Sequence, residues 1–293
     1  MTNTVVGGGD KAPRRRSRHR RRFINRRPNR RVGLLLAFLP FVLVIIAYVL
    51  ASNARLAENP SDRFLPSLAT MANTFWEMAF TPEARTGDYL LWTDTASSLV
   101  RLGLGMAIST LLAITLGIAI GFLPLVRTFF APLVAAISLV PPLAILPILF
   151  IFLGLGETAK IALIVIGTAP VMIRSVAKTV SEIPEEQIVK AETLGASTWQ
   201  MIIRIAVPQA MPHVVTAARL GLVPAWIFLI SAEAIQATSG LGYRIFLVRR
   251  YSAMDIILPY VFWITLLAYS LDFTLRTFAA RAFRWAYPKG AGL

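Results

Sequence analysis

Few residue types in this chain could carry out covalent chemistry. Its 293 residues include no cysteine and only two histidines, His19 and His213, which argues against thiol nucleophiles, disulfides and Cys/His metal sites. The sequence contains no His-Glu-x-x-His and no Gly-x-Ser-x-Gly motif, so an intramembrane hydrolase is not expected. None of the five lysines follows a glycine, so the chain lacks a phosphate-binding loop for ATP. We therefore expect no catalysis, cofactor or metal in this chain itself.

Charged side chains inside apolar stretches are the next candidates for a functional role. A charge in a membrane-spanning segment costs free energy and often marks a solute path or a coupling group. Four such residues lie in or near apolar stretches: Arg101, Arg219, Glu233 and Asp272. Most lie toward the ends of their stretches. Glu233 is the exception, because it lies inside the fifth apolar window, within the last turn or so of the expected helix. Two interpretations of Glu233 stay open: contact with a transported solute or gate, and a structural hydrogen bond.

Three prolines within seven residues, Pro141, Pro142 and Pro147, interrupt one apolar stretch. Each proline removes a backbone donor and bends a helix, and the carbonyl groups that it frees must face protein or a polar cavity. The cluster therefore predicts an irregular helix that lines a translocation path or gate. A kink that only improves packing is the alternative.

The composition indicates which kind of fold must position these residues. Hydrophobic residues make up 56% of the chain and charged residues only 15%, with a mean hydropathy of +0.64. Soluble domains carry about a quarter charged residues. Six apolar windows lie at residues 32–51, 97–123, 131–153, 159–173, 217–235 and 256–274. We therefore expect an all-α, polytopic membrane protein with about six transmembrane helices.

A basic arm precedes the first window. Twelve Arg and Lys residues lie between Lys11 and Arg31, against a single acid, Asp10. Clustered arginines can bind nucleic acid. These adjoin an apolar segment, so we expect them instead to hold the N-terminus in the cytoplasm and to contact anionic lipid headgroups. Six spans then place both termini on the cytoplasmic side of a bacterial inner (plasma) membrane, with no nucleic acid as a partner.

The loops between the windows agree with this orientation, with one exception. The inner loops and the C-terminal end carry Arg127, Arg174, Lys178, Arg276, Arg281, Arg284 and Lys289. Arg244, Arg249 and Arg250 lie between the fifth and sixth windows and therefore fall outside. Two roles stay open for these three: attraction of an acidic extracytoplasmic protein, and headgroup contact by a short external helix.

The polar segment after the first window carries more acids than bases and is expected outside the membrane. Within it, residues 66–80 place Leu68, Met71, Phe75 and Trp76 at helical spacing between polar residues. We predict an amphipathic helix there, lying at the outer interface.

The longest polar segment inside the apolar region, residues 175–215, has an ordered pattern. Pro184 suits the start of a helix, and Gly195 suits its C-terminal end. Ser197 and Gln200 have the spacing of a capping box, so a second helix should begin at Ser197 and end at Pro208. An apolar stripe on this second helix predicts either packing beneath the membrane domain or a surface that docks another subunit. The stripe consists of Trp199, Ile202, Ile203 and Ala206.

The same segment resembles the EAA motif of ABC importer permeases. Val-Lys-Ala-Glu-Thr-Leu-Gly at residues 189–195 is followed by Ile-Ala-Val-Pro at residues 205–208. Val189 and Lys190 stand where the family has Glu and Ala. The resemblance implies that this segment docks the ATPase subunit. The residues concerned would be Ala191, Glu192, Leu194, Gly195, Ala196, Ser197, Trp199, Gln200, Ile205 and Pro208.

Other stretches are similar to the nitrate, sulfonate, taurine and bicarbonate branch of that family. They are residues 139–147, 194–200, 232–233 and 239–243. The resemblance implies a MetI-like permease fold, a homodimer in the membrane, two copies of a separate ATPase subunit and an extracytoplasmic solute-binding protein. In that arrangement Arg244, Arg249 and Arg250 are candidate contacts for the binding protein.

The resemblance and the windows together divide the chain into four parts. These are a basic cytoplasmic arm (1–31), a first transmembrane helix with an external loop (32–96), a permease core (97–285) containing the coupling loop 175–215, and a C-terminal tail (286–293). An autonomous secondary transporter of a small solute is the alternative function. That class often shows inverted repeats and buried titratable groups, and no convincing repeat is present.

Overall fold

The computed structural model describes residues 29–60, 62–83 and 87–286, and these parts contain helices and no strands. They fall into two compact units that divide between residues 51 and 52, and each unit is described by itself. All of the predicted basic arm except residues 29–31, and all of the predicted C-terminal tail except residue 286, lie outside the described residues. In the first unit, most of α1 (Arg30–Glu58) forms one apolar helix long enough to cross a membrane, as predicted.

The second unit contains the remaining predicted spans. Four of them are single long helical runs. They are α3 (Leu90–Leu112) continued by η2 (Ala113–Gly117) and α4 (Ile118–Phe122), α7 (Glu157–Ser181), α9 (Thr198–Met201) continued by η4 (Ile202–Ala206) and α10 (Val207–Gln236), and α12 (Met254–Ala282).

The remaining span is broken rather than straight. Helix α5 (Pro124–Ser138) is followed by the 3-10 helix η3 (Pro142–Ile145) and by α6 (Leu146–Leu153), and the two halves meet at 84°. The described chain therefore has five apolar helices long enough to span a membrane, or six when this bent pair counts as one. The prediction of an all-α fold with about six transmembrane helices is confirmed.

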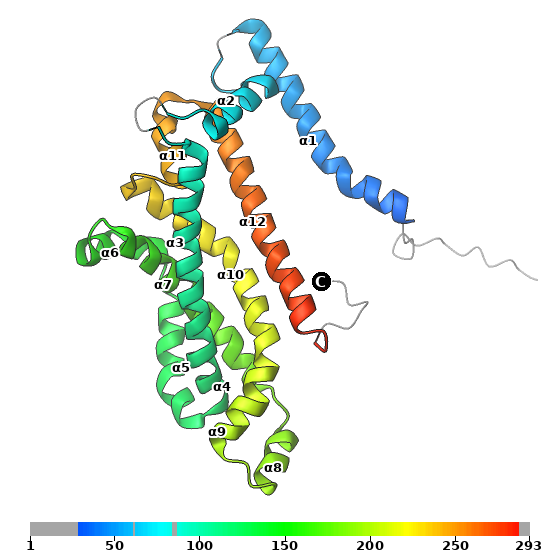
Figure 1. Ribbon diagram of the computed structural model, residues 1–293, viewed down its shortest axis with the longest axis vertical. Helices are drawn as coiled ribbons and strands as arrows, with labels where there is room; N and C mark the ends of the chain where they lie inside the picture. The colour runs from blue at the N-terminus through cyan, green and yellow to red at the C-terminus, as the bar shows by residue number, and fades with distance from the viewer. Residues whose placement is uncertain (1–28, 61, 84–86, 287–293) are drawn as a thin grey trace, which may run out of the picture. The chain divides into compact units, whose positions relative to one another are not determined.

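Helix α7 forms the centre of the second unit and packs against α3, α4 and α10 (Figure 1). Small residues allow the close approach of α3 and α4 to α7. A Cβ atom built on Gly105 would lie 2.6 Å from Cγ2 of Ile164, and one built on Gly121 would lie 2.5 Å from Cβ of Val180. Ile164 is fully buried. Larger side chains at either glycine would force these helices apart.

The predicted amphipathic helix is present as α2 (Leu68–Phe80). Ser67 precedes it, and the Ser67 hydroxyl accepts a hydrogen bond from the backbone N–H of Thr70 at 3.1 Å, an N-cap that fixes where the helix begins. One face, including Ala79, packs against the core, while Trp76 is 64% exposed. The position of this helix at the outer membrane interface stays a prediction.

The expected end of a helix at Pro208 is wrong, because the helical run continues through this residue into α10. Residues Ile202–Ala206, which Val207 separates from Pro208, form a π-helix. Proline has no backbone N–H to donate, and its ring would clash with the carbonyl group one turn earlier in a regular α-helix. The wider π-helical turn makes room for the ring, so the helical run can continue. Pro208 therefore lies in the first turn of α10 instead of ending the helical run before it.

Candidate functional site

Most of the predicted functional residues fall into three regions of the second unit. The docking segment comprises residues 184–208. The buried charge network consists of Asp94, Ser98, Arg101, Glu157, Lys160, Glu233, Arg244 and Tyr260. The proline break comprises residues 139–147. Arg219 on α10 and Asp272 on α12 lie outside these regions and pair with each other at 2.9 Å. Figure 1 places α8 (Glu185–Thr193), in the docking segment, and α11 (Leu241–Val248), which carries Arg244, at opposite ends of this unit.

The first half of the docking segment is a short helix closed by glycine. Helix α8 ends at Thr193, and Gly195 takes a positive φ of 78°. The N–H of Ala196 donates to the carbonyl of Ala191 at 3.0 Å, and the N–H of Gly195 donates to the carbonyl of Glu192 at 2.9 Å. These two bonds form a Schellman motif, in which glycine is favoured because its φ is positive. The predicted glycine bend is therefore present, with Ala191 and Ala196 at its two ends.

The second half begins with the predicted capping box. The Ser197 hydroxyl accepts the backbone N–H of Gln200 at 3.3 Å, and the Gln200 side-chain oxygen accepts the backbone N–H of Ser197 at 2.9 Å. Both bonds are local, so they set the direction of α9 without help from the rest of the protein. The helix, bend, helix geometry expected from the sequence is confirmed.

The apolar stripe on the second helix has one side packed against the bundle and one side exposed, so each of its two interpretations fits part of it. Ala206 is fully buried, and half-buried Ile202 packs against the core, so this side holds the segment to the bundle. Trp199 and Ile203 are 68% and 46% exposed. Leu194, at the tip of the bend, is 87% exposed. The outer side of the segment is thus an apolar surface that no described residue covers.

At the other end of the unit, Glu233 lies completely buried near the end of α10. Its carboxylate accepts hydrogen bonds from Arg101 Nη1 at 2.7 Å, from the Ser98 hydroxyl at 2.8 Å and from the backbone N–H of Gly242 at 2.9 Å. Three donors of this kind satisfy a buried carboxylate. The geometry favours the structural interpretation of Glu233, which joins α10 to α3 and α11.

Arg101 continues this network toward α7. It donates to the carbonyl of Ser239 at 2.8 Å and forms a two-bond ion pair with Glu157, whose Oε1 lies 2.9 Å from Arg101 Nη2. Lys160, which is almost fully buried, also pairs with Glu157 at 2.9 Å. Acids and bases therefore alternate from α10 through α3 to α7, and Glu157 brings this chain of charges to the surface.

A second buried acid, Asp94, holds the turn between α10 and α11. It accepts the backbone N–H of Gly240 at 2.9 Å, Arg244 Nε at 2.8 Å and the Tyr260 hydroxyl at 3.1 Å. Gly240 has φ of 130° and ψ of 157°, and a Cβ atom there would lie 2.6 Å from the carboxylate of Glu233. Only glycine suits this backbone and this spacing.

These contacts separate the three arginines that the sequence grouped together. Burial lowers the pKa of Arg244, but the hydrogen bond and charge of Asp94 more than offset this, so the pKa lies above its ordinary value. Arg249 and Arg250, in the 3-10 helix η5 (Arg249–Tyr251), are exposed. The Arg249 guanidinium lies over the Phe246 ring at 5.0 Å. Arg244 therefore belongs to the charge network, whereas Arg249 and Arg250 present their charge to the outside of the molecule.

The three clustered prolines occupy the break between α5 and α6. Pro141 precedes η3, Pro142 begins it, and Pro147 lies in the first turn of α6. Leu139, immediately before the break, is 81% exposed. The predicted irregularity is thus present in the backbone, and its role in a translocation path stays a prediction.

Sequence reasoning missed most of the buried charge network. The sequence prediction places Asp94 in the external loop within residues 32–96 and assigns no role to Ser98 or Tyr260. One signal was available: Asp94, Ser98 and Arg101 follow one another at helical spacings of four and three residues, which places them on one face of α3. No comparable pattern marks Tyr260, which reaches Asp94 from a distant part of the chain.

Residues 109–284 match the family of binding-protein-dependent transport system inner membrane components. The chain belongs to this family. It is the non-catalytic, membrane-spanning permease component of an ABC transporter. The matched region contains the whole docking segment and the proline break, and it begins after Asp94, Ser98 and Arg101.

Several curated relatives are permeases of named transport systems. The taurine transport system permease TauC of Escherichia coli is 37% identical over 199 residues, which cover 68% of this chain and 72% of the relative. The putative aliphatic sulfonates permease SsuC of Bacillus subtilis is 26% identical and covers 86% and 87% of the two chains. The bicarbonate permease CmpB of Synechocystis is 28% identical, over 62% of this chain and 65% of CmpB.

Solved structures of an inward-facing methionine ABC transporter, MetNI, share the fold. One matches with a TM-score of 0.58 at 20% identity, covering 68% of this chain and 99% of the matched chain. A second crystal form matches with a TM-score of 0.52. The expected MetI-like permease fold is confirmed.

Proposed function

We propose that this permease forms the membrane path of an ATP-driven importer for small sulfonates or related oxyanions. The observation that carries the substrate class is the 37% identity to a taurine permease, together with likeness to sulfonate and bicarbonate permeases. A loaded extracytoplasmic binding protein delivers the solute, and two permease copies enclose the path. The core of each copy is residues 97–285, and both termini lie in the cytoplasm.

The proposed attachment point for the two ATPase subunits is the docking segment. Its support is physical: an exposed apolar edge, formed by Leu194, Trp199 and Ile203, lies on two short helices whose ends are fixed by local hydrogen bonds. A hydrogen bond of 2.8 Å from Gln209 to Gln187 ties α8 to α10. Movement of an attached ATPase would therefore pass directly into the long helix α10.

Co-purification tests this attachment. The double variant Gly195→Glu and Trp199→Asp should insert in the membrane but lose the ATPase, because it replaces the bend and the exposed apolar edge with charge. Its matched control is Arg281→Glu with Phe278→Asp, which changes exposed residues on α12. A complete complex in the docking variant, with full transport, would show that the ATPase binds elsewhere.

The proposed binding-protein contact lies at the opposite end, at Arg249 and Arg250. Both are exposed, and their charges can attract an acidic surface over the Debye length, about 8 Å at physiological ionic strength. Arg244 supports this contact indirectly, since its pair with Asp94 holds α11, which leads directly into the 3-10 helix of the other two.

A further inference from the structure

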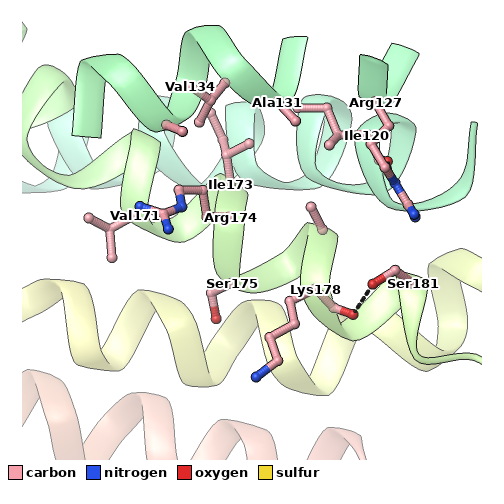
Figure 2. Close-up of a pocket in the computed structure, with 12 residues that line it drawn as sticks. Ile120, Arg127, Ala131, Val134, Val171, Ile173, Arg174, Ser175, Lys178 and Ser181 are labelled. Atoms are coloured by element: carbon pink, nitrogen blue, oxygen red, sulfur yellow. Dashed lines mark hydrogen bonds between the residues drawn. The ribbon is translucent and has the colours of Figure 1, made fainter. Parts of the chain in front are cut away.

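An open cavity of about 740 Å³ lies between α4, α5 and the C-terminal half of α7. Arg127 comes from α5, while Arg174, Ser175, Lys178 and Ser181 come from α7 (Figure 2). Because α7 leads through two residues into the docking segment, the cavity lies at the same end of the unit as that segment. The cavity is therefore separate from the buried charge network and lies at the proposed cytoplasmic end.

The charge of this cavity is entirely positive. Its lining includes Arg127, Arg174 and Lys178 and no acidic residue. The nearest acid along the chain, Glu182, reaches Lys178 only at 3.9 Å, and both of these side chains are largely exposed. An exposed pair at this distance neutralises little charge. The cavity thus presents two or three uncompensated cations to whatever fills it.

Arg174 is the most informative of the three. Among the residues that the structure describes, none forms a hydrogen bond or ion pair with its guanidinium. Arg127 differs, because it donates to the carbonyl groups of Ile120 at 3.1 Å and Gly121 at 2.5 Å, at the end of α4. Arg127 holds the cavity wall, and Arg174 is available to a ligand.

The rest of the cavity lining is apolar, comes from all three helices, and is called the apolar wall below. It is formed by Ile120, Ala131, Val134, Ala135, Val171, Ile173 and Ala177. Figure 2 shows Arg174 and Arg127 at different parts of the rim rather than aimed at one point. Cations spread around a hollow with an apolar wall suit an anion that carries a short apolar group, and they suit weak binding rather than tight capture.

We propose that this cavity binds an oxyanion group bearing an apolar tail, held by Arg174 and Lys178 against the apolar wall. Two sources have this chemistry: a small sulfonate leaving the translocation path, and the phosphate of an anionic lipid. The small-sulfonate source rests on the proposed function, whereas the oxyanion site itself does not.

The absence of native cysteine allows a direct test. Ser175→Cys places one thiol in the cavity, and its reaction with N-ethylmaleimide is followed in the permease–ATPase complex in nanodiscs of phosphatidylcholine. Ethanesulfonate should slow this reaction at least about threefold relative to chloride at equal ionic strength, because it occupies the space beside the thiol. Nanodiscs containing phosphatidylglycerol form the second arm, and slowing there without ethanesulfonate identifies lipid as the source.

Charge variants decide whether the protection is specific. Added to Ser175→Cys, the pair Arg174→Gln and Lys178→Gln should abolish protection in both arms. Arg281→Gln with Arg284→Gln, which removes two exposed charges near the C-terminal end, should preserve it. Equal reaction rates under all conditions, or protection that survives loss of Arg174 and Lys178, would overturn the proposed site.

A separate measurement keeps this result distinct from the proposed function. ATP hydrolysis stimulated by a taurine-loaded binding protein reports whether the permease serves sulfonate import. Stimulation without protection overturns the cavity site and leaves the import function standing. Protection of the introduced thiol without stimulation of ATP hydrolysis supports the oxyanion site. It removes the proposal that the permease imports sulfonates, and leaves lipid or another oxyanion as the natural ligand.

Discussion

The two ends of the permease core are held in place by different kinds of interaction. The docking segment is set by hydrogen bonds between neighbours in sequence, such as those of Ser197 with Gln200, and its outer side is exposed. The turn between α10 and α11 is set by side chains more than 130 residues away, including Arg101 on Glu233 and Asp94 on Gly240. The proposed docking surface is thus held in shape by its own neighbouring residues, whereas the opposite end depends on assembly of the whole bundle.

Loss of one charge from the buried network should have the largest effect on stability. Arg101→Met leaves the carboxylate of Glu233 buried without its cation, which costs about 3–5 kcal/mol when a buried pair is broken from one side. Thermal unfolding of the detergent-solubilised permease should therefore occur at a clearly lower temperature. Arg281→Met, at an exposed position, is the matched control.

The double variant sharpens this prediction. Replacing both partners by methionine removes the uncompensated charge, so Arg101→Met with Glu233→Met should recover part of the lost stability. If the single variant unfolds at the wild-type temperature, the network does not hold this end of the bundle together.

Two glycines with positive φ give a smaller, paired test. Gly240 lies in a region of φ and ψ that is essentially restricted to glycine, and an added Cβ would also meet the Glu233 carboxylate. Gly240→Ala should therefore lower the unfolding free energy by more than about 2 kcal/mol, since strain of about 1–3 kcal/mol adds to the steric clash. Gly195→Ala has open space around its Cβ and should cost only about 1 kcal/mol of left-handed strain.

A third variant separates strain from contact at the docking segment. Asparagine tolerates the left-handed conformation better than alanine, so Gly195→Asn should keep ATPase binding closer to the wild type than Gly195→Ala does. Thermal unfolding and co-purification measure the two effects. If Gly195→Ala and Gly240→Ala lowered the free energy of unfolding equally, the two ends would not differ in how their backbone is held.

The contrast also explains what the sequence could reveal. Proline, glycine and a Ser–Gln pair at fixed spacing report local geometry, so the bend at Gly195 and the cap at Ser197 were predictable. The continuation of the helix through Pro208 was not, because it depends on a π-helix that no local pattern marks. The partners of Glu233 and Arg244 depend on how α3, α10 and α11 pack, and one sequence contains no direct signal of that packing.

The smallest effect is expected at Arg249 and Arg250, where the free energy of unfolding should change by no more than the exposed contact of Arg249 with Phe246 contributes, about 0.5–1 kcal/mol. Both side chains are exposed, and their proposed role is long-range attraction of an acidic binding protein. In the variant Arg249→Gln with Arg250→Gln, the concentration of loaded binding protein that gives half-maximal ATP hydrolysis should rise about threefold at low salt, as expected for a lost steering charge. The basal rate of hydrolysis should stay the same.

Salt dependence distinguishes this attraction from headgroup contact. The Debye length falls from about 10 Å at 0.1 M salt to about 3 Å at 1 M, so the difference between variant and wild type should shrink as salt is added. Arg281→Gln with Arg284→Gln, at the C-terminal end of α12, should behave as the wild type throughout. An unchanged half-maximal concentration at every salt level, in a variant that inserts normally, would assign Arg249 and Arg250 to the lipid surface. Arg244 would then be the only member of the original three with a structural role, through its pair with Asp94.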